Sequence, residues 1–153
     1  MLKEIISDYQ TKGKLNYLHI HHGFKLSKES RNRISKGVRS IAPEAQISFV
    51  YINKHTPIRL YDSNPEGDGT LPRGAYVMTG LNKFYISTTG KNDFHQKGMG
   101  TPRPLEIIVR RDNSKNRFDA NIYAQHILSL TRLNWASIKD FCREPITLKY
   151  SED

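Results

Sequence analysis

Cysteine is almost absent from this chain of 153 residues, which contains only Cys142. One cysteine cannot form an intramolecular disulfide, and a metal site made of several cysteine ligands is excluded. No apolar run approaches the roughly 18 residues that a membrane-spanning helix needs. The first residues also lack the apolar stretch of a secretory signal peptide. We therefore expect a cytoplasmic protein without a membrane partner.

Familiar enzyme motifs are also missing. The sequence has no Ser/His/Asp order, no glycine-rich phosphate loop and no pair of carboxylates at a recognisable spacing. His19, His21 and His22 suggest a metal site, but alternation along a strand places His22 on the opposite face from the other two. Packed or surface imidazoles are the simpler interpretation. The sequence thus predicts no metal ligand and no cofactor.

Positive charge, in contrast, is abundant. The chain has 24 Lys and Arg against 15 Asp and Glu, a net charge of +9. Such a field attracts polyanions, so nucleic acid is the leading partner class. The alternative is a basic surface that is merely solvated. Three basic groups are expected at element ends or in loops: Lys54 and His55 with Arg59, the loop 91–103 with Lys97 and Arg103, and Arg143 with Lys149.

Apolar periodicity predicts helices and strands in alternation. Helices are expected over 2–11, over 28–40 with Ser27 as the N-cap, and from Asp119 as the N-cap through about Trp135, with Ile122, Ile127, Leu130 and Leu133 inward. A capping-box pattern over 137–140 predicts one further helical turn. Strands are expected over 15–21, 46–53, 59–61, 74–79, 83–88, 105–110 and 145–150. The order predicts a mixed α/β fold in a single domain, residues 1–153.

Four stretches in this order resemble the second half of the PIWI domain of long prokaryotic Argonautes. They are Leu18–Gly23 (LHIHHG), Ile47–Tyr61, Phe84–Ser87 leading into Gly100–Pro104 (GTPRP), and Leu130–Trp135 followed by Pro145–Ser151. The resemblance covers essentially the whole chain. It implies a partial RNase H-like (PIWI) α/β fold, a mixed sheet flanked by helices that lacks its first strands. It also implies a role in prokaryotic defence.

The same resemblance bears on cleavage. Argonautes that cut use four metal-binding positions, and the first two of these would lie upstream of Met1. The third falls on His22 in place of an Asp, and the fourth falls on Glu152 with Asp153 beside it. An imidazole cannot bridge two Mg²⁺ ions as a carboxylate does. The resemblance therefore implies binding without catalysis, with Mg²⁺ relevant only if other acids complete the site.

Nucleic-acid contacts can be carried over in the same way. The implied partners are guide RNA or DNA and its target, held by contacts to phosphate and sugar that do not read bases. The missing N-terminal and MID half, or a second copy docked on an open sheet edge, are further expected partners. The residues expected to contact nucleic acid are Lys54, His55, Arg59, Thr88, Lys97, Arg103 and Lys149.

Two other functions remain open. One is a metal-dependent, RNase H-like endonuclease that uses His22, Glu152 and Asp153 with acids from a partner chain. The other is a scaffold that docks other defence proteins and shows no salt-dependent affinity for oligonucleotides.

Overall fold

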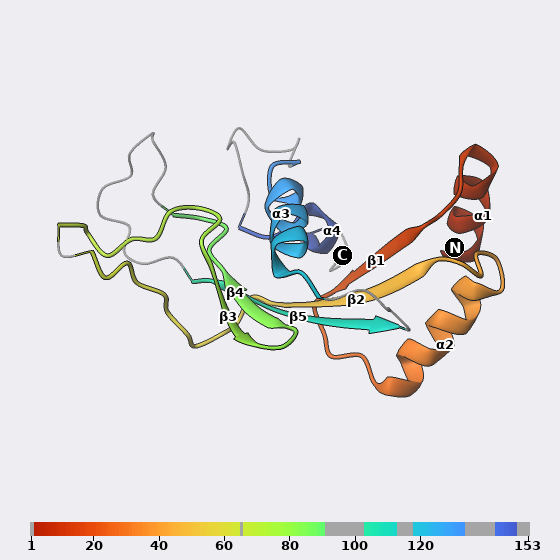
Figure 1. Cartoon of the computed structure of the whole chain (residues 1–153), viewed down its shortest axis with the longest axis horizontal. Helices are drawn as coiled ribbons and strands as arrows, with labels where there is room; N and C mark the ends of the chain where they lie inside the picture. Colours follow the sequence, from red (N-terminus) through yellow and green to blue (C-terminus); the bar gives the residue numbers. More distant parts are fainter. Residues whose placement is uncertain (1, 65, 91–102, 113–117, 134–142, 150–153) are drawn as a thin grey trace. The chain divides into compact units, whose positions relative to one another are not determined.

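The computed structural model describes residues 2–64, 66–90, 103–112, 118–133 and 143–149, of which Lys149 only by its backbone (Figure 1). The chain divides into two compact units, which are described separately. Unit 1 comprises Met1–Tyr51 and Val109–Arg117, and unit 2 comprises Ile52–Ile108 and Phe118–Asp153.

The strands of the described residues form one mixed sheet in the order β1-β2-β5-β4-β3 (Figure 1). Strand β1 (Tyr17–His22) pairs in parallel with β2 (Gln46–Asn53). Strand β3 (Tyr76–Gly80) is antiparallel to β4 (Lys83–Ile86), which is antiparallel to β5 (Leu105–Asp112). The expected mixed sheet flanked by helices is thereby confirmed.

Two helices belong to unit 1, α1 (Leu2–Lys12) and α2 (Lys28–Arg39). The side chain of Ser27 accepts a 3.0 Å hydrogen bond from the Ser30 backbone N–H, so the predicted N-cap of α2 is confirmed. Strand β2 starts and ends where its apolar run predicts. Buried side chains of both helices, of β2 and of the connection between α2 and β2 form the core of unit 1: Ile6, Val38, Ala42, Ala45, Ile47 and Phe49.

Unit 2 contains α3 (Ala120–Leu130), whose N-cap Asp119 accepts a 2.9 Å hydrogen bond from the Asn121 backbone N–H. The buried residues of α3 recur at helical spacing: Ala120, Tyr123, Ala124 and Ile127. Side chains of β4 and β5 supply further buried apolar residues, among them Phe84, Ile86, Leu105 and Ile107.

Several predicted elements are wrong in detail. Residues 59–61 form no strand. Residues 145–150 were expected to be extended, but Ile146–Lys149 form the short helix α4. The backbone N–H of Leu148 bonds to the Pro145 carbonyl at 2.9 Å, and the ring of Pro145 suits the start of a helix.

The predicted inward face of α3 also needs correction. Ile122 and Leu133 are 47% and 42% exposed, because the small alanines of α3 pack inward instead. The helix ends at Leu130, well before residue 135. The capping-box pattern at 137–140 lies outside the described residues. No helix in the described ranges combines the length and apolar character needed to cross a bilayer.

Candidate nucleic-acid interface

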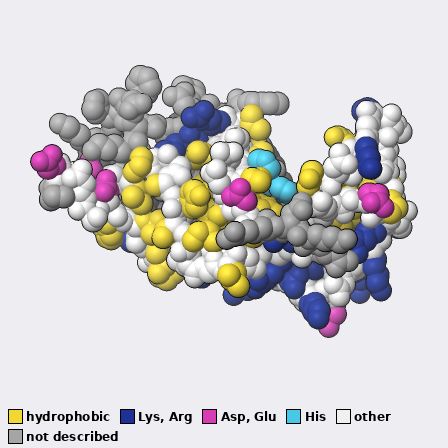
Figure 2. Space-filling model, viewed as in Figure 1, with side chains coloured by type: hydrophobic (Ala, Val, Ile, Leu, Met, Phe, Trp, Pro, Cys, Tyr) yellow, Lys and Arg dark blue, Asp and Glu magenta, His cyan; other side chains and the backbone are white. Residues whose placement is uncertain are grey.

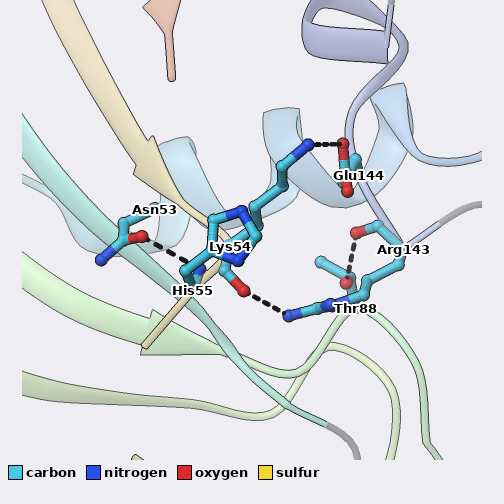
Figure 3. A network of polar contacts seen from close by, with 6 residues as sticks. All are labelled: Asn53, Lys54, His55, Thr88, Arg143 and Glu144. Carbon is cyan, nitrogen blue, oxygen red and sulfur yellow. Dashed lines mark hydrogen bonds and ion pairs between the residues drawn. The ribbon is translucent and has the colours of Figure 1, made fainter. Parts of the chain in front are cut away.

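The end of β2 is shaped by the side chain of Asn53. Its Oδ1 accepts a 3.0 Å hydrogen bond from the His55 backbone N–H (Figure 3). Its Nδ2 donates a 2.8 Å hydrogen bond to Oε2 of Glu106. An Asn that bonds to the backbone two residues later forms an Asx turn, which ends regular pairing. The chain therefore leaves the strand at Lys54.

Arg143 fastens this turn to the segment that follows β4. Its Nη2 donates a 2.6 Å hydrogen bond to the Lys54 carbonyl (Figure 3). The carbonyl of Arg143 accepts a 2.6 Å hydrogen bond from the Thr88 hydroxyl, whose residue is only 1% exposed. Residues that lie far apart in the sequence, 54, 88 and 143, thus meet through two short hydrogen bonds.

The side chain of Lys54 extends from the same turn to Glu144. The Lys54 Nζ lies 3.4 Å from the Glu144 Oε2, and both side chains keep about a quarter of their surface exposed (Figure 3). A partly exposed ion pair of this length is weak, because water and salt screen it. An incoming anion can therefore compete with Glu144 for Lys54.

Further cations surround Arg143. Burial lowers the pKa of Arg143; the Glu144 carboxylate opposes this shift, and the positive charges of Arg103 and Arg59 lower the pKa further. Arg59 is half-buried and Arg103 is exposed. Lys54, Arg59, Arg103 and Arg143 are called the cation cluster below. Their mutual repulsion is relieved by an anion, and Glu144 supplies only one negative charge.

The segment that carries Arg59 is fixed by local polar contacts and forms no strand. Thr56 is buried, and its hydroxyl accepts a 3.2 Å hydrogen bond from the Ile58 backbone N–H. The Arg59 Nη1 donates to the Ile58 carbonyl at 3.2 Å. The remaining donors of the guanidinium fork suit a phosphate oxygen.

Arg73 supports the residues around Thr88. Its Nε donates to the Thr88 carbonyl at 3.0 Å, and its Nη2 donates to the Thr131 hydroxyl at 2.6 Å and to the Leu128 carbonyl at 3.3 Å. Burial lowers the pKa of Arg73, and the charge of Arg132 lowers it further. Arg73 therefore connects α3 to the backbone at Thr88, a structural role for a basic residue.

The structure describes some, but not all, of the residues predicted to contact nucleic acid. Lys54 and Thr88 are hydrogen-bonded to Arg143, Thr88 through the Arg143 carbonyl, and the charges of Arg59 and Arg103 act on Arg143. His55 is exposed and follows Lys54 on the Asn53 turn (Figure 3). Lys97, Glu152, Asp153 and the side chain of Lys149 lie outside the described residues.

Two residues of the interface were not predicted, Glu144 and Arg73. Nothing local marks Glu144, because its partner Lys54 is 90 residues away in the sequence. Arg73 stands between a proline and a glycine, and Gly74 has a φ of +92°. A glycine with a positive φ indicates a turn with a defined backbone conformation. The arginine beside it could therefore have been expected to hold that backbone in place.

His22 ends β1 in unit 1. Its Nδ1 lies 2.6 Å from the Phe24 carbonyl oxygen, which only accepts, so Nδ1 carries the proton. Burial lowers the pKa of His22, the bond to Phe24 opposes this, and the charge of Arg31 lowers the pKa again. The ring also lies 5.7 Å from the Tyr51 ring. His22 is therefore a packed, neutral imidazole at neutral pH.

Mg²⁺ prefers oxygen ligands in octahedral geometry. The neutral imidazole of His22 offers one nitrogen, which suits Zn²⁺ or Cu²⁺ better than Mg²⁺. Among the residues that the structure describes, no group of three or more His, Cys, Asp or Glu could hold a metal ion. The described residues around His22 thus do not fit the Mg²⁺ that the resemblance implies for cleaving relatives.

No protein-family model and no curated protein matches the sequence. Solved structures do match. A Clostridium butyricum Argonaute bound to a guide DNA and a 19-mer target DNA has a TM-score of 0.72 and 20% identity, over 97% of this chain and 18% of that one. An Aquifex aeolicus Argonaute has a TM-score of 0.65 and 17% identity, over 97% and 19%.

A further Aquifex aeolicus Argonaute, with externally bound siRNA, has a TM-score of 0.65 and 18% identity over 99% of this chain and 19% of that one. The chain thus spans about a fifth of the length of the Argonautes that it matches. The resemblance seen in the sequence is confirmed for the fold: this chain has the PIWI-like α/β fold of part of a prokaryotic Argonaute.

Proposed function

We propose that residues 1–153 are the C-terminal part of a single PIWI domain that grips a guide strand and a guide–target duplex by the backbone. The cation cluster carries this proposal. Lys54 and Arg59 follow β2, Arg103 precedes β5, and Arg143 donates to the Lys54 carbonyl. Glu144 is the acidic residue paired with Lys54. Phosphate contacts of this kind position a strand without reading its bases.

The construction of the cluster favours an extended anion over a single small one. Arg59 and Arg103 approach Arg143 from different segments, and Lys54 comes from a third. Arginine presents several donors in a planar fork that matches phosphate oxygens. Successive phosphates of one strand would relieve the repulsion at several of these positions at once.

Binding without cleavage is part of the proposal. The support is His22, which stands where cleaving relatives are expected to hold a carboxylate and which is neutral and packed between Phe24 and Tyr51. The fold it shares with Argonautes supplies the context for a guide strand. Cleavage would require acids from elsewhere to compensate for the missing carboxylate at this position.

The test is binding of a labelled single strand and of a duplex, as RNA and as DNA, over a salt series with Mg²⁺ present. We expect affinity to fall as salt rises, with intact substrate on the gel. Arg59→Ala and Arg103→Ala should weaken binding, and Arg132→Ala, an exposed cation outside the cluster, should not. Cleavage that Glu152→Ala abolishes would favour the nuclease, and salt-independent or absent binding would favour the scaffold.

A further inference from the structure

The positive charge of the chain is divided very unequally between the two units. Unit 1 has 13 Lys and Arg against five Asp and Glu, a net charge of +8, whereas unit 2 has 11 against ten, a net charge of +1. Every member of the cation cluster belongs to unit 2. Most of the net positive charge that predicts a polyanionic partner therefore belongs to unit 1, outside the cation cluster.

Helix α2 concentrates much of this charge. Its 12 residues include five Lys and Arg and one acidic residue, Glu29. The exposed positions form one continuous stripe, since they recur at intervals of three or four residues. Lys28, Glu29, Asn32, Arg33 and Lys36 are exposed and are called the α2 face below. Figure 2 shows Lys and Arg side chains gathered over α2.

Among the described residues, no acidic side chain pairs with the cations of the α2 face. Two other cations of unit 1 do have ion-pair partners, since Arg39 lies 3.1 Å from Asp112 and Lys12 lies 3.1 Å from Asp8. Within the described residues, Lys28, Arg33 and Lys36 form no ion pair. Three unpaired cations on consecutive turns of one helix present a row of positive charge to solvent.

The distribution of apolar side chains on α2 indicates which kind of polyanion can bind to its exposed face. Ile34 and Val38 pack into the core of unit 1, and Ser35 is buried there as well. The α2 face itself has no apolar side chain, so the helix cannot insert into a membrane as amphipathic membrane helices do. Asn32, between the cations, can donate a hydrogen bond to a phosphate oxygen. The chemistry of the face therefore matches a nucleic-acid backbone.

We infer that the α2 face is a second nucleic-acid backbone contact, separate from the cation cluster. The class of ligand rests on the proposed function, whereas the location rests on the charge of unit 1. Binding at the α2 face adds sequence-independent grip, and each phosphate neutralised there steepens the dependence of affinity on salt.

Lysine footprinting locates the contact directly. The whole chain is acetylated with and without a short duplex, and each lysine is read by mass spectrometry. We expect the duplex to protect Lys28 and Lys36, while Lys12 and Lys14, exposed lysines of the same unit, stay reactive. Protection of Lys54 reports on the cation cluster in the same sample. Lys54 protected with Lys28 and Lys36 still reactive would overturn this inference and leave the proposed function standing.

The converse result, protection of Lys28 and Lys36 alone, would support the α2 face and contradict the cation cluster. Two double variants, each lacking two positive charges, allow the salt dependence of binding to be compared quantitatively. Arg33→Gln with Lys36→Gln should reduce the salt slope of binding by about 0.9 for each phosphate that the α2 face no longer neutralises, whereas Lys12→Gln with Lys14→Gln should leave it unchanged. The assignment would be overturned if both double variants had the same salt slope of binding. It would also be overturned if poly-glutamate protected Lys28 and Lys36 from acetylation as well as the duplex does.

Discussion

The Nη2 of Arg143 lies 2.6 Å from the carbonyl oxygen of Lys54, so an arginine near the end of the chain holds the turn that ends β2. We predict that Arg143→Lys lowers the free energy of unfolding by about 1–3 kcal/mol, because lysine keeps the charge but lacks the planar fork. Urea unfolding measures this. Wild-type stability in Arg143→Lys would show that the bond does not fix the turn.

Thr88 acts on the same network from the opposite side. Its buried hydroxyl donates to the Arg143 carbonyl at 2.6 Å. Thr88→Val keeps the shape and removes the donor, so we expect a loss of about 1–2 kcal/mol in the free energy of unfolding. Thr79→Val, on exposed β3, is the matched control and should change little. Equal effects of both substitutions would contradict the role given to Thr88.

Glu106 holds Asn53 in place and should make the free energy of unfolding depend on pH in the acidic range. Burial raises the pKa of Glu106, but hydrogen bonds from Lys83 at 2.6 Å and from Asn53 at 2.8 Å outweigh it and keep the pKa below its ordinary value. A depressed carboxyl pKa stabilises the fold above the unfolded pKa, and this stability is lost as pH falls through the folded pKa.

Urea unfolding over an acidic pH series tests this contribution of Glu106. The wild type should lose more stability than Glu106→Gln as pH falls below the ordinary range of a glutamate. Parallel curves for the two proteins would show that the contacts of Glu106 with Lys83 and Asn53 contribute nothing.

His22 should also cost the fold stability as pH falls, but over a higher pH range than Glu106. Burial lowers its pKa, so the unfolded chain binds a proton more readily than the folded one. Stability from the neutral ring is complete above the ordinary histidine pKa and is lost as pH falls from there toward the folded pKa. The stability difference between wild type and His22→Gln should therefore change between about pH 7 and pH 5. A constant difference would mean that His22 does not titrate with folding.

Much of the fold follows from local sequence. The apolar run 46–53 predicts both ends of β2, and Ser27 predicts the start of α2. The prediction of an extended segment over 145–150 was wrong. Ile146 and Thr147 are β-branched and locally favour a strand, but the turn after Pro145 overrides this preference. Local patterns could predict Lys54 and Arg59 as basic residues at a strand end.

The partners of these residues were beyond prediction from sequence. Arg143 was recognised only as one of a basic pair, and its bond to Lys54 spans 89 positions. Such an interaction depends on how strands and helices pack, which periodicity does not encode. The unequal charge of the two units was hidden for the same reason, since unit 1 combines two separate segments of the chain.

Dimerisation through an open sheet edge stays a prediction. Strands β1 and β3 are the edges of the described sheet, and Tyr76, Val77 and Met78 of β3 are each about 40% exposed. Exposed apolar edges recruit other strands, and a lysine on the edge prevents this. Sedimentation velocity should show a dimer that Val77→Lys dissociates. A clean monomer of the wild type at high concentration would rule the dimer out.

The central claim is that the cation cluster grips a nucleic-acid backbone without cutting it. Its most direct test is the affinity of wild type, Arg59→Ala and Arg103→Ala for a labelled guide–target duplex over a salt series with Mg²⁺. The account predicts salt-sensitive binding that both substitutions weaken, a salt slope that falls by about one unit for each phosphate no longer neutralised, and intact duplex throughout. Unchanged binding in both variants, or a cleaved duplex, would contradict it.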